Sequence, residues 1–253
     1  MIILNAFKDL ILMKNILSRE LPQSINVLGG LFHILDDNMF QLEMCVDSWP
    51  TFSTAICYGQ KQVQLESTHH QILKEMASLR GLHLKDISGC FRTFIHYSPE
   101  TFSRPQKTYK YKKTTTSLSE SHAVLVVNTR RHGTSKECIN LVKAYIKYLP
   151  NYCVVDEKGQ PVSWLLTDEF NEIRMAYTQP EYRRAGHLRE LYSALIQQRI
   201  SAGLPVFGCI LKENRASHNA ALSFGMTPCI VTYFVLTSDD CVKAHPNTGN
   251  LPV

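Results

Sequence analysis

Residues 171–199, NEIRMAYTQPEYRRAGHLRELYSALIQQR, decide the fold of this chain. Their pattern predicts a β-strand over residues 172–178, a turn that contains a proline, a basic loop with one glycine, and then a long helix. The helix is amphipathic, because its apolar residues recur at helical rather than strand spacing. These residues are Leu188, Leu191, Tyr192, Leu195, Ile196 and Ile200.

The loop before this helix has the features of an anion-binding site. Gly186 stands at the junction of loop and helix, where a missing side chain lets the backbone approach an anion. The first N–H groups of a helix point outward and carry the positive end of its dipole. Arg183 and Arg184 add formal charge beside them. We interpret the loop as a pyrophosphate cradle, although the motif by itself leaves open a helix start that binds nothing.

The composition limits the classes of protein that this chain can belong to. It has 253 residues, 44% of them hydrophobic, which is enough for one large or two small domains. A net charge of +5 suits a protein that binds small anions, and it is well short of the dense basic surface of a nucleic-acid-binding protein. We therefore expect no nucleic-acid partner.

The cysteines and histidines predict no metal site. The eight cysteines include no C-x-x-C pair, so we interpret them as reduced thiols in a reducing compartment. His69, His70 and His83 lack the spacing to a cysteine or carboxylate partner that a metal site requires.

The sequence predicts two domains. Residues 1–121 form the first and residues 122–240 the second, followed by a tail over residues 241–253. Residues 98–121 are rich in Lys, Ser and Thr and predict a linker. Its basic run, RPQKTYKYKK, is interpreted as a solvated loop in preference to a segment that binds RNA or acidic lipid. No stretch has the length and hydrophobicity of a membrane span or a secretory signal.

Most of the expected elements alternate between strand and helix. In the first domain, an amphipathic helix with Leu10, Met13 and Leu17 on one face precedes a hairpin of residues 25–36 and 40–46. Strands at 54–58 and 91–97 and a helix at 65–80 follow. In the second domain we expect a strand at 124–127, a helix at 135–149, a hairpin of 154–155 and 162–167, the strand at 172–178, the long helix, a strand at 205–211, a helix at 214–224 and a strand at 229–236.

This order of elements in the second domain resembles the GNAT acyltransferase superfamily. That superfamily has the loop motif Gln/Arg-x-x-Gly-x-Gly/Ala, which RRAGHL over residues 183–188 matches except at Leu188. A second GNAT motif begins with an asparagine and ends in Gly-Phe, and it aligns with Asn214, Gly225 and Met226. The resemblance implies an α/β fold with a mixed sheet, in which a GNAT-like N-terminal half packs on a C-terminal half that binds acyl-CoA.

Longer stretches narrow the resemblance to the glycine N-acyltransferase family. They are NVLGGLFHI, VDSWPTF over residues 46–52, and DEKGQPVSWLLTDEFNEIRMAYTQPEYRRAG over residues 156–186. The resemblance covers residues 1–61 and 124–236, with a shorter middle than family members usually have. It implies transfer of an acyl group from acyl-CoA to the amine of glycine, with acyl-CoA as co-substrate and no permanently bound cofactor.

The resemblance places the catalytic base at Glu172, which would take a proton from the ammonium group of glycine. The residues alone favour a strand-end glutamate paired with Arg174, a residue that is also an option for holding the carboxylate of glycine. The thioester oxyanion is expected to meet a backbone N–H near Tyr177 or Thr178. The diphosphate is expected on the loop and first helical turn. The residues implied there are Arg183, Arg184, Ala185, Gly186, His187 and Leu188.

Two residues near the end of the chain leave their roles open. Asn214 is a contact to pantetheine or phosphate, a helix cap, or both. Many GNAT enzymes have a tyrosine as leaving-group acid where this chain has Ala221, so we expect no dedicated acid. His218 is interpreted as a surface histidine rather than as a substitute for that acid.

Two other functions remain as alternatives to glycine acylation. The short middle is compatible with a non-catalytic protein that binds acyl-CoA, and another amine, such as glutamine or a protein lysine, could be the acceptor. The resemblance implies a monomeric protein without integral membrane association. It also implies an intracellular location, in mitochondria first and in the cytoplasm or at the endoplasmic reticulum as alternatives.

Overall fold

The computed structural model describes residues 2–59, 62–67, 82–86, 91–96, 115–130, 135–229 and 234–238. The chain divides into two compact units, residues 1–93 with 229–252 and residues 94–228. This division differs from the predicted boundary at residue 121, and the C-terminal segment returns to the first unit.

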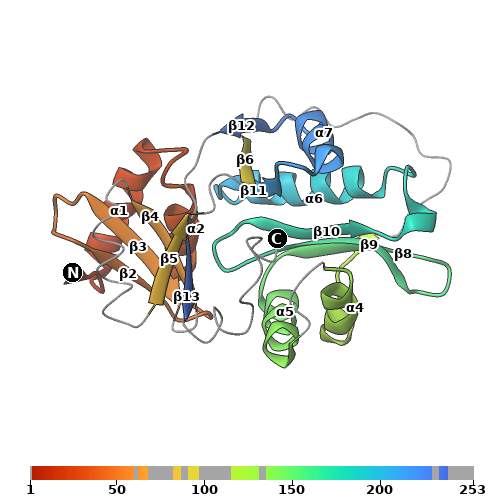
Figure 1. Cartoon of the computed structure of the whole chain (residues 1–253), viewed down its shortest axis with the longest axis horizontal. Coiled ribbons are helices and arrows are strands. Elements are labelled where there is room, and N and C mark those ends of the chain that lie inside the picture. The colour runs from red at the N-terminus through yellow and green to blue at the C-terminus, as the bar shows by residue number, and fades with distance from the viewer. Residues whose placement is uncertain are drawn as a thin grey trace. The chain divides into compact units, whose positions relative to one another are not determined.

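Among its described residues, the first unit combines helices α1 and α2 with antiparallel strands (Figure 1). One sheet has the strand order β1-β2-β3-β4, and β5 pairs with β13 in another. The bounds are β1 (Ile2–Ile3), α1 (Phe7–Arg19), α2 (Ile25–Leu35), β2 (Leu42–Val46), β3 (Thr54–Gly59), β4 (Gln62–Ser67), β5 (Leu82–Asp86) and β13 (Phe234–Ser238).

Helix α1 is confirmed, and Leu10, Met13 and Leu17 are its buried residues. The predicted hairpin is wrong in its first half, because residues 25–35 form helix α2. Its residues 25–31 are all buried, so no polar face reveals the helical period, and a short apolar run of this kind does not separate helix from strand. The strand expected at 54–58 is confirmed by β3.

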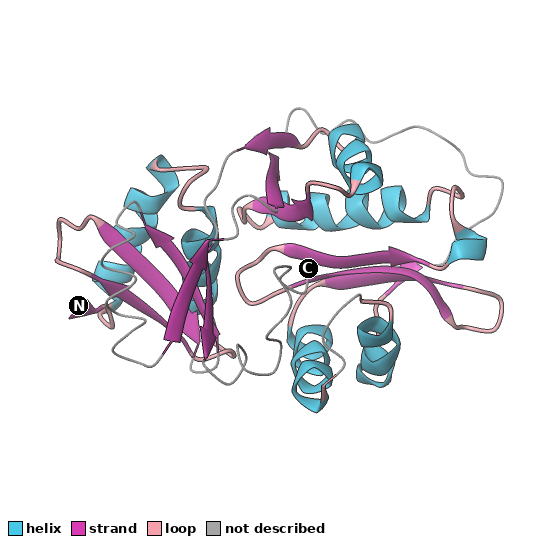
Figure 2. Ribbon diagram, viewed as in Figure 1, coloured by secondary structure: helices cyan, strands magenta, loops and turns pink. Residues whose placement is uncertain are grey.

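The second unit has a central antiparallel sheet with helices on both faces (Figure 2). Its strand order is β10-β9-β8-β7, and a three-stranded sheet, β11-β6-β12, lies beside α6 and α7. The bounds are β6 (Phe91–His96), β7 (Thr115–Thr116), η2 (Glu120–His122), α4 (Ala123–Asn128), α5 (Lys136–Tyr148), β8 (Asn151–Val155), β9 (Pro161–Thr167), β10 (Ile173–Thr178), η3 (Pro180–Tyr182), α6 (His187–Ser201), β11 (Val206–Leu211), α7 (Arg215–Ser223) and β12 (Thr227–Cys229).

The predicted elements of this unit are mostly confirmed, with two corrections. The strand expected at 124–127 is helix α4, because a capping box at Ser119 and the turn η2 start a helix that overrides the β-propensity of its valines. The single strand expected at 229–236 is two strands, β12 and β13, in different sheets. Of the helix expected at 65–80, residues 65–67 belong to β4 and residues 68–80 lie outside the described residues.

Two other predicted segments are described only in part. Residues 98–114 of the predicted linker and the tail at 241–253 lie outside the described residues, and Thr115 and Thr116 pair with β8 as strand β7. Within the described part of the chain, none of the six cysteines forms a disulfide bond. No helix described by the structure is long and apolar enough to cross a membrane.

The core of the second unit fixes the position of the site. Apolar side chains of β8, β9 and β10 pack against α6 and α7 in one buried cluster, while α4 and α5 lie on the opposite side of the sheet (Figure 1). Ile173 belongs to this cluster, together with Leu191 and Leu195 of α6. Burial of Ile173 anchors the start of β10, where the polar residues described below are concentrated.

Candidate active site

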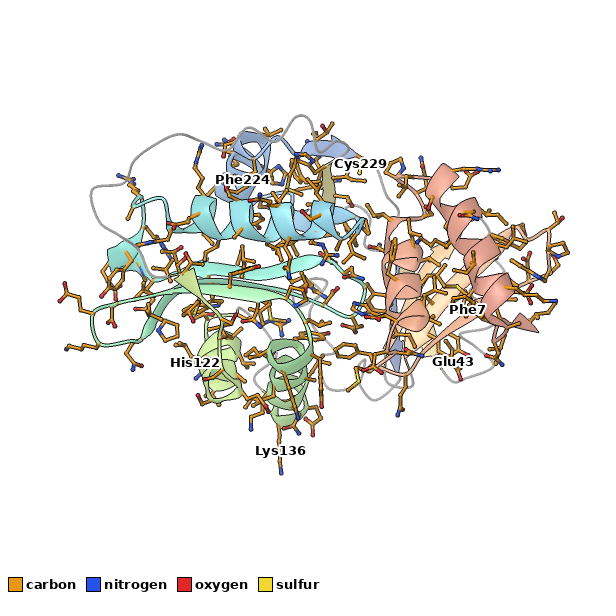
Figure 3. The ribbon with its side chains drawn as sticks, turned by 180° about the vertical axis from the view of Figure 1, so that it is seen from behind. Phe7, Glu43, His122, Lys136, Phe224 and Cys229 are labelled. Carbon is orange, nitrogen blue, oxygen red and sulfur yellow. The ribbon has the colours of Figure 1, made fainter. Side chains whose placement is uncertain are left out.

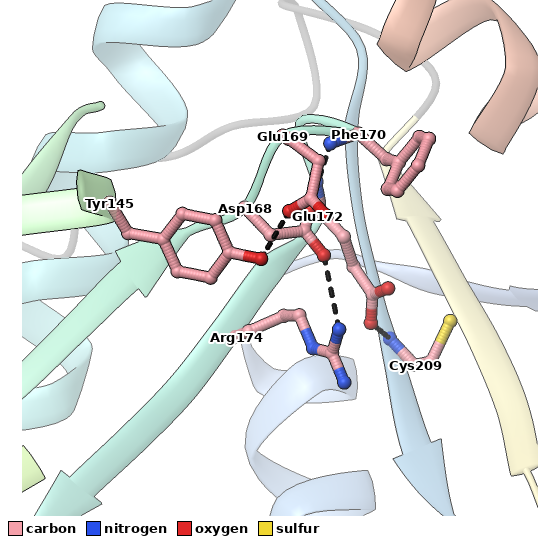
Figure 4. A network of polar contacts seen from close by, with 7 residues as sticks. All are labelled: Tyr145, Asp168, Glu169, Phe170, Glu172, Arg174 and Cys209. Atoms are coloured by element: carbon pink, nitrogen blue, oxygen red, sulfur yellow. Dashed lines mark hydrogen bonds and ion pairs between the residues drawn. The ribbon is translucent and has the colours of Figure 1, made fainter. Parts of the chain in front are cut away.

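The turn between β9 and β10 is organised around one buried carboxylate. Asp168 accepts hydrogen bonds from the backbone N–H groups of Phe170, at 3.0 Å, and of Glu172, at 2.9 Å (Figure 4). Asn171 lies between them with φ of 64°, a left-handed conformation that asparagine tolerates better than most residues. These bonds fix the backbone from which the Glu172 side chain projects.

Glu172 is buried at the start of β10, with 5% of its surface exposed. Its Oε1 accepts a hydrogen bond from the backbone N–H of Cys209, on β11, at 2.9 Å. Burial raises the pKa of Glu172 to about 7, the positive charge of Arg174 opposes the rise, and the negative charge of Asp168 adds to it. A carboxyl with this pKa is divided between its acid and base forms at neutral pH, as a general base requires.

Arg174 forms an ion pair with Asp168 rather than with Glu172. Its Nη1 lies 3.2 Å from Oδ2 of Asp168, which is fully buried, while the arginine side chain is 41% exposed. The negative charge of Glu172 is nevertheless the main cause that raises the pKa of Arg174, so the Glu172 carboxyl lies nearby. The pairing of Glu172 with Arg174 expected from the residues alone is therefore an electrostatic contact without a hydrogen bond.

A β-bulge interrupts β10 directly after Arg174. Arg174 pairs with Leu166 of β9 and Tyr177 pairs with Trp164, so Met175 and Ala176 together face one residue of β9. Met175 has φ of 54°. The irregular backbone thus lies at residues 175–176, two residues before the position expected for an oxyanion donor.

Strands β10 and β11 touch at one end but belong to different sheets. Gly208 of β11 lies so close to β10 that an added Cβ would be 3.1 Å from the carbonyl oxygen of Ile173. The Cys209 N–H bond to Glu172 holds the same junction. Beyond it the bulge follows on β10, and no ladder joins the two strands among the described residues.

The basic loop leads from β10 into α6 with two left-handed residues. Arg184 has φ of 63°, and Gly186, the N-cap of α6, has φ of 78°. The N–H of Glu190 is the first to bond within the helix, to the oxygen of Gly186 at 3.3 Å, so the amides before it precede the helical pattern. Arg184 and Ala185 are exposed, as a cradle open to an anion requires.

The other residues of the predicted cradle have structural contacts. Arg183 donates from Nε to the carbonyl oxygen of Thr178 at 3.1 Å and lies over the Tyr177 ring, so it ties the loop to β10. Thr178 is buried and its hydroxyl lies 2.8 Å from that of Ser163. His187 is buried, and Leu188 packs against the core.

The residues of α7 and its N-cap that the sequence analysis considered have structural roles. Asn214 caps α7, because its Oδ1 accepts a hydrogen bond from the N–H of Ser217 at 3.1 Å. His218 is only partly exposed, with Nε2 3.0 Å from the oxygen of Leu211 and its ring edge against Phe94. Ala221 is buried in the core.

Several buried polar residues around Glu172 were not predicted from the sequence. The Tyr145 hydroxyl donates to the carboxyl of Glu169, whose pKa is raised to about 7 by burial and by the charge of Asp168. Arg199 of α6 is 1% exposed and donates to Oδ1 of Asn171 at 2.8 Å. The acidic run Asp168-Glu169 just before a predicted strand was the only available signal, since Tyr145 and Arg199 are distant in sequence.

Comparison with known proteins shows the family of this chain. Residues 1–76 match the family model described as aralkyl acyl-CoA:amino acid N-acyltransferase, and residues 152–235 match the model of its C-terminal region. The chain belongs to this family. The second match contains Glu172, the bulged strand and the basic loop, so the candidate active site lies within the region that this model matches. The predicted α/β class is confirmed, because both units combine helices with sheets, although helix α4 takes the place of the first strand expected in the second domain.

Two named relatives are similar in sequence to most of this chain. Glycine N-acyltransferase-like protein Keg1 of Mus musculus is 25% identical, in an alignment that covers 85% of this chain and 91% of the relative. Glycine N-acyltransferase of Bos taurus is 22% identical, with 90% of this chain and 96% of the relative covered. An X-ray structure of a Drosophila protein has a similar fold, with a TM-score of 0.69, 11% identity, and 93% and 98% of the two chains covered.

Proposed function

We propose that this acyltransferase moves an acyl group from acyl-CoA to the amine of glycine and releases N-acylglycine and CoA. The observation that carries the proposal is the carboxyl of Glu172, which is buried, raised in pKa to about 7, and held at the start of the bulged strand that leads into the basic loop. A base, an irregular backbone and a candidate anion site thus follow one another within one segment.

The reaction begins with removal of a proton from the ammonium group of glycine. Glu172 takes this proton, directly or through one water, and the free amine attacks the thioester carbonyl. The negative charge that develops on the carbonyl oxygen needs a backbone N–H donor, and the bulge at Met175 and Ala176 is where β10 departs from its ladder with β9. CoA then leaves as a thiolate, since a thiol with a pKa near 8.5 departs without a dedicated acid, and this thiolate takes up the second proton that the attacking nitrogen loses as the amide forms.

The acyl-CoA side of the site is proposed at the start of α6. The amides of residues 184–188 would hold the diphosphate, supported by the exposed charge of Arg184. Arg183 has the different task of joining the loop to β10, through its bond to Thr178. Asn214 has its capping role in α7 and its amide nitrogen remains as a second contact for the co-substrate.

Free-thiol release tests the proposal. The purified chain is mixed with benzoyl-, octanoyl- or oleoyl-CoA and with glycine, glutamine or a lysine peptide. Thiol release that depends on glycine with at least one donor supports the proposal. Release with glutamine or the peptide but not with glycine would overturn the glycine assignment, and binding of acyl-CoA without any release would indicate a non-catalytic protein.

Glu172→Gln tests the base. We expect kcat to fall by roughly a hundredfold or more at pH 7, because general base catalysis of this kind contributes about 10²–10⁴-fold. The loss should be smaller at alkaline pH, where free glycine is unprotonated, and acyl-CoA affinity should be retained. Glu157→Gln, in the exposed turn between β8 and β9, is the matched control. Unchanged turnover in Glu172→Gln would remove this residue from the mechanism.

A further inference from the structure

Arg199 is a buried cation near the C-terminal end of α6. Only 1% of its surface is exposed. Its Nε donates a hydrogen bond to the carbonyl oxygen of Pro205 at 2.9 Å, and its Nη2 donates one to Oδ1 of Asn171 at 2.8 Å. Both acceptors are uncharged, and the third guanidinium nitrogen, Nη1, has no hydrogen-bond partner within the described part of the chain. Burial of a guanidinium on neutral acceptors costs free energy, which points to a task beyond filling the core.

The two acceptors of Arg199 lie just before the two strands that hold the candidate base. Asn171 directly precedes Glu172 at the entry to β10, and Pro205 directly precedes β11. These two strands come together where the backbone N–H of Cys209, on β11, donates to Oε1 of Glu172 (Figure 4). Arg199 is thus bonded to both segments whose contact holds the carboxyl of the base.

Asn171 has a backbone conformation that depends on its surroundings. Its φ of 64° lies in the left-handed region, which an L-residue adopts only at a cost in free energy. Its N–H bonds to the carbonyl oxygen of Asp168 at 2.9 Å, within the turn, and Arg199 holds its side chain from the side of α6. A planar peptide joins Asn171 to Glu172, so any rotation of the Asn171 backbone would redirect the base.

Helix α6 connects this contact to the proposed acyl-CoA cradle. The cradle lies at the N-terminus of the helix, and Arg199 lies near its other end, about 18 Å away at a rise of roughly 1.5 Å per residue. The helix is fixed between these ends, because its apolar side chains belong to the core cluster of the second unit. Tyr192 of α6 also stacks on Phe224, at 4.6 Å between ring centroids, and Figure 3 labels Phe224 beside the helix. One packed helix therefore carries both the cradle and the arginine that holds the base turn.

We propose that Arg199 is a positioning residue for Glu172, which it holds at a fixed distance from the acyl-CoA cradle through its bonds to Asn171 and Pro205. This proposal rests on the proposed function and deepens it, because it names a residue that acts through the base without touching a substrate. The planar guanidinium suits this task, since it donates to two acceptors in a fixed geometry. An apolar side chain at this position would lose both hydrogen bonds.

Arg199→Met tests the proposal, because it keeps a long unbranched side chain and removes every donor. We expect kcat at pH 7 to fall by roughly tenfold to a hundredfold, since a displacement of about 1 Å at a reacting group can cost about 10²-fold. KM for acyl-CoA should stay unchanged, because the cradle is at the other end of α6. The loss of kcat should be smaller at alkaline pH, where glycine needs no base. Arg199→Lys should restore part of kcat, since it keeps the charge and one donor group.

A double variant distinguishes positioning of the base from a general effect on the enzyme. In the Glu172→Gln background the base is already absent, so Arg199→Met should lower kcat little further. A loss of kcat as large as in the wild-type background would overturn the proposal. The matched control is Gln197→Met, which makes the same kind of change at an exposed position of the same helix. This control should have the wild-type kcat in both backgrounds.

Hydrogen exchange followed by mass spectrometry tests the positioning without catalysis. Peptides that cover residues 168–173 should exchange faster in Arg199→Met than in the wild type, and at the wild-type rate in Gln197→Met. Unchanged exchange in Arg199→Met, or a loss of kcat that is equal at every pH, would overturn the proposal. Thermal unfolding identifies a variant that has lost its fold, in which case Arg199→Lys carries both tests. Absence of thiol release with every acceptor would instead overturn the proposed function, and the exchange experiment would still decide the positioning.

Discussion

Three carboxyl groups share a small buried volume at the β9–β10 turn. Asp168, Glu169 and Glu172 are each at most 5% exposed, and burial raises the pKa of all three. Arg174 is the cation paired with them, through Asp168. Like charges held together in a low-dielectric site raise one another's pKa values, and this is how a folded protein produces a base that works near neutral pH.

Glu169 allows the electrostatic cost of this cluster to be measured without removing the base. Its pKa is raised from 4.5 to about 7, so the folded state binds its proton more tightly than the unfolded state does. The ionisation of Glu169 therefore costs no stability below pH 4.5, and its full cost is present above pH 7. The free energy of unfolding should fall as the pH rises through this window.

Glu169→Gln should reduce this loss of stability at high pH. The amide oxygen of the glutamine can still accept the hydrogen bond from the Tyr145 hydroxyl, but the side chain cannot ionise. One pKa unit corresponds to about 1.4 kcal/mol, so the variant should be more stable than the wild type at pH 8 by on the order of 2–3 kcal/mol. Urea unfolding at pH 4.5, 6 and 8 measures the difference. An identical pH dependence of stability in both proteins would mean that folding does not raise the pKa of Glu169.

Helix α6 has a left-handed glycine at each end, and the two positions have different tasks. Gly186 caps its N-terminus with φ of 78°, inside the basic loop, and Gly203 follows its C-terminus with φ of 66°. An added Cβ at Gly203 would meet nothing within 4 Å. Both glycines relieve the backbone strain that an L-residue would have, but only Gly186 belongs to the proposed cradle.

Substitution of each glycine by alanine distinguishes an effect on backbone strain from an effect on acyl-CoA binding. Gly186→Ala and Gly203→Ala should each lower stability by about 1–2 kcal/mol, the cost of a left-handed L-residue. Gly186→Ala should also weaken acyl-CoA binding severalfold in calorimetry, because the added Cβ would stand in the proposed cradle. Gly203→Ala should bind acyl-CoA as the wild type does. Equal affinities in the two variants would argue against the cradle.

At the scale of the whole molecule, the chain crosses between its units more than once. The first unit begins the chain, the second follows, and β13 returns to pair with β5 in the first unit. Strand β13 thus belongs to the first unit, although its first residues still lie within the matched C-terminal region. A break near residue 121 would separate β5 from its partner strand.

Proline in β13 tests which unit this strand stabilises. Leu236 of β13 pairs with Leu84 of β5. Leu236→Pro removes the backbone N–H donor at this position, and a strand tolerates that loss poorly. Hydrogen exchange followed by mass spectrometry should show faster exchange in β4 and β5, with β8, β9 and β10 unchanged. Leu236→Ala keeps the donor and is the control. Loss of protection in the second unit instead would support the boundary expected from the sequence.

The sequence determined the elements that have a clear period or a local start signal. The segment 171–199 predicted β10, its loop and α6 correctly, because the hydrophobic repeat, Gly186 and the two arginines are all local in sequence. Asn214 as a helix cap follows from the same kind of rule. Residues 25–35 and 124–127 were misassigned, since complete burial hides the period of α2 and a preceding cap decides α4.

Tertiary structure alone decided the chemistry around Glu172. Its pKa depends on burial, on Asp168 and Arg174, and on the N–H of Cys209 from another strand, and none of these can be evaluated before the chain is folded. The same holds for the hydrogen bond from Arg199 to Asn171, which are 28 positions apart. Local patterns specify local backbone, whereas desolvation and charge interactions depend on distances that only packing sets.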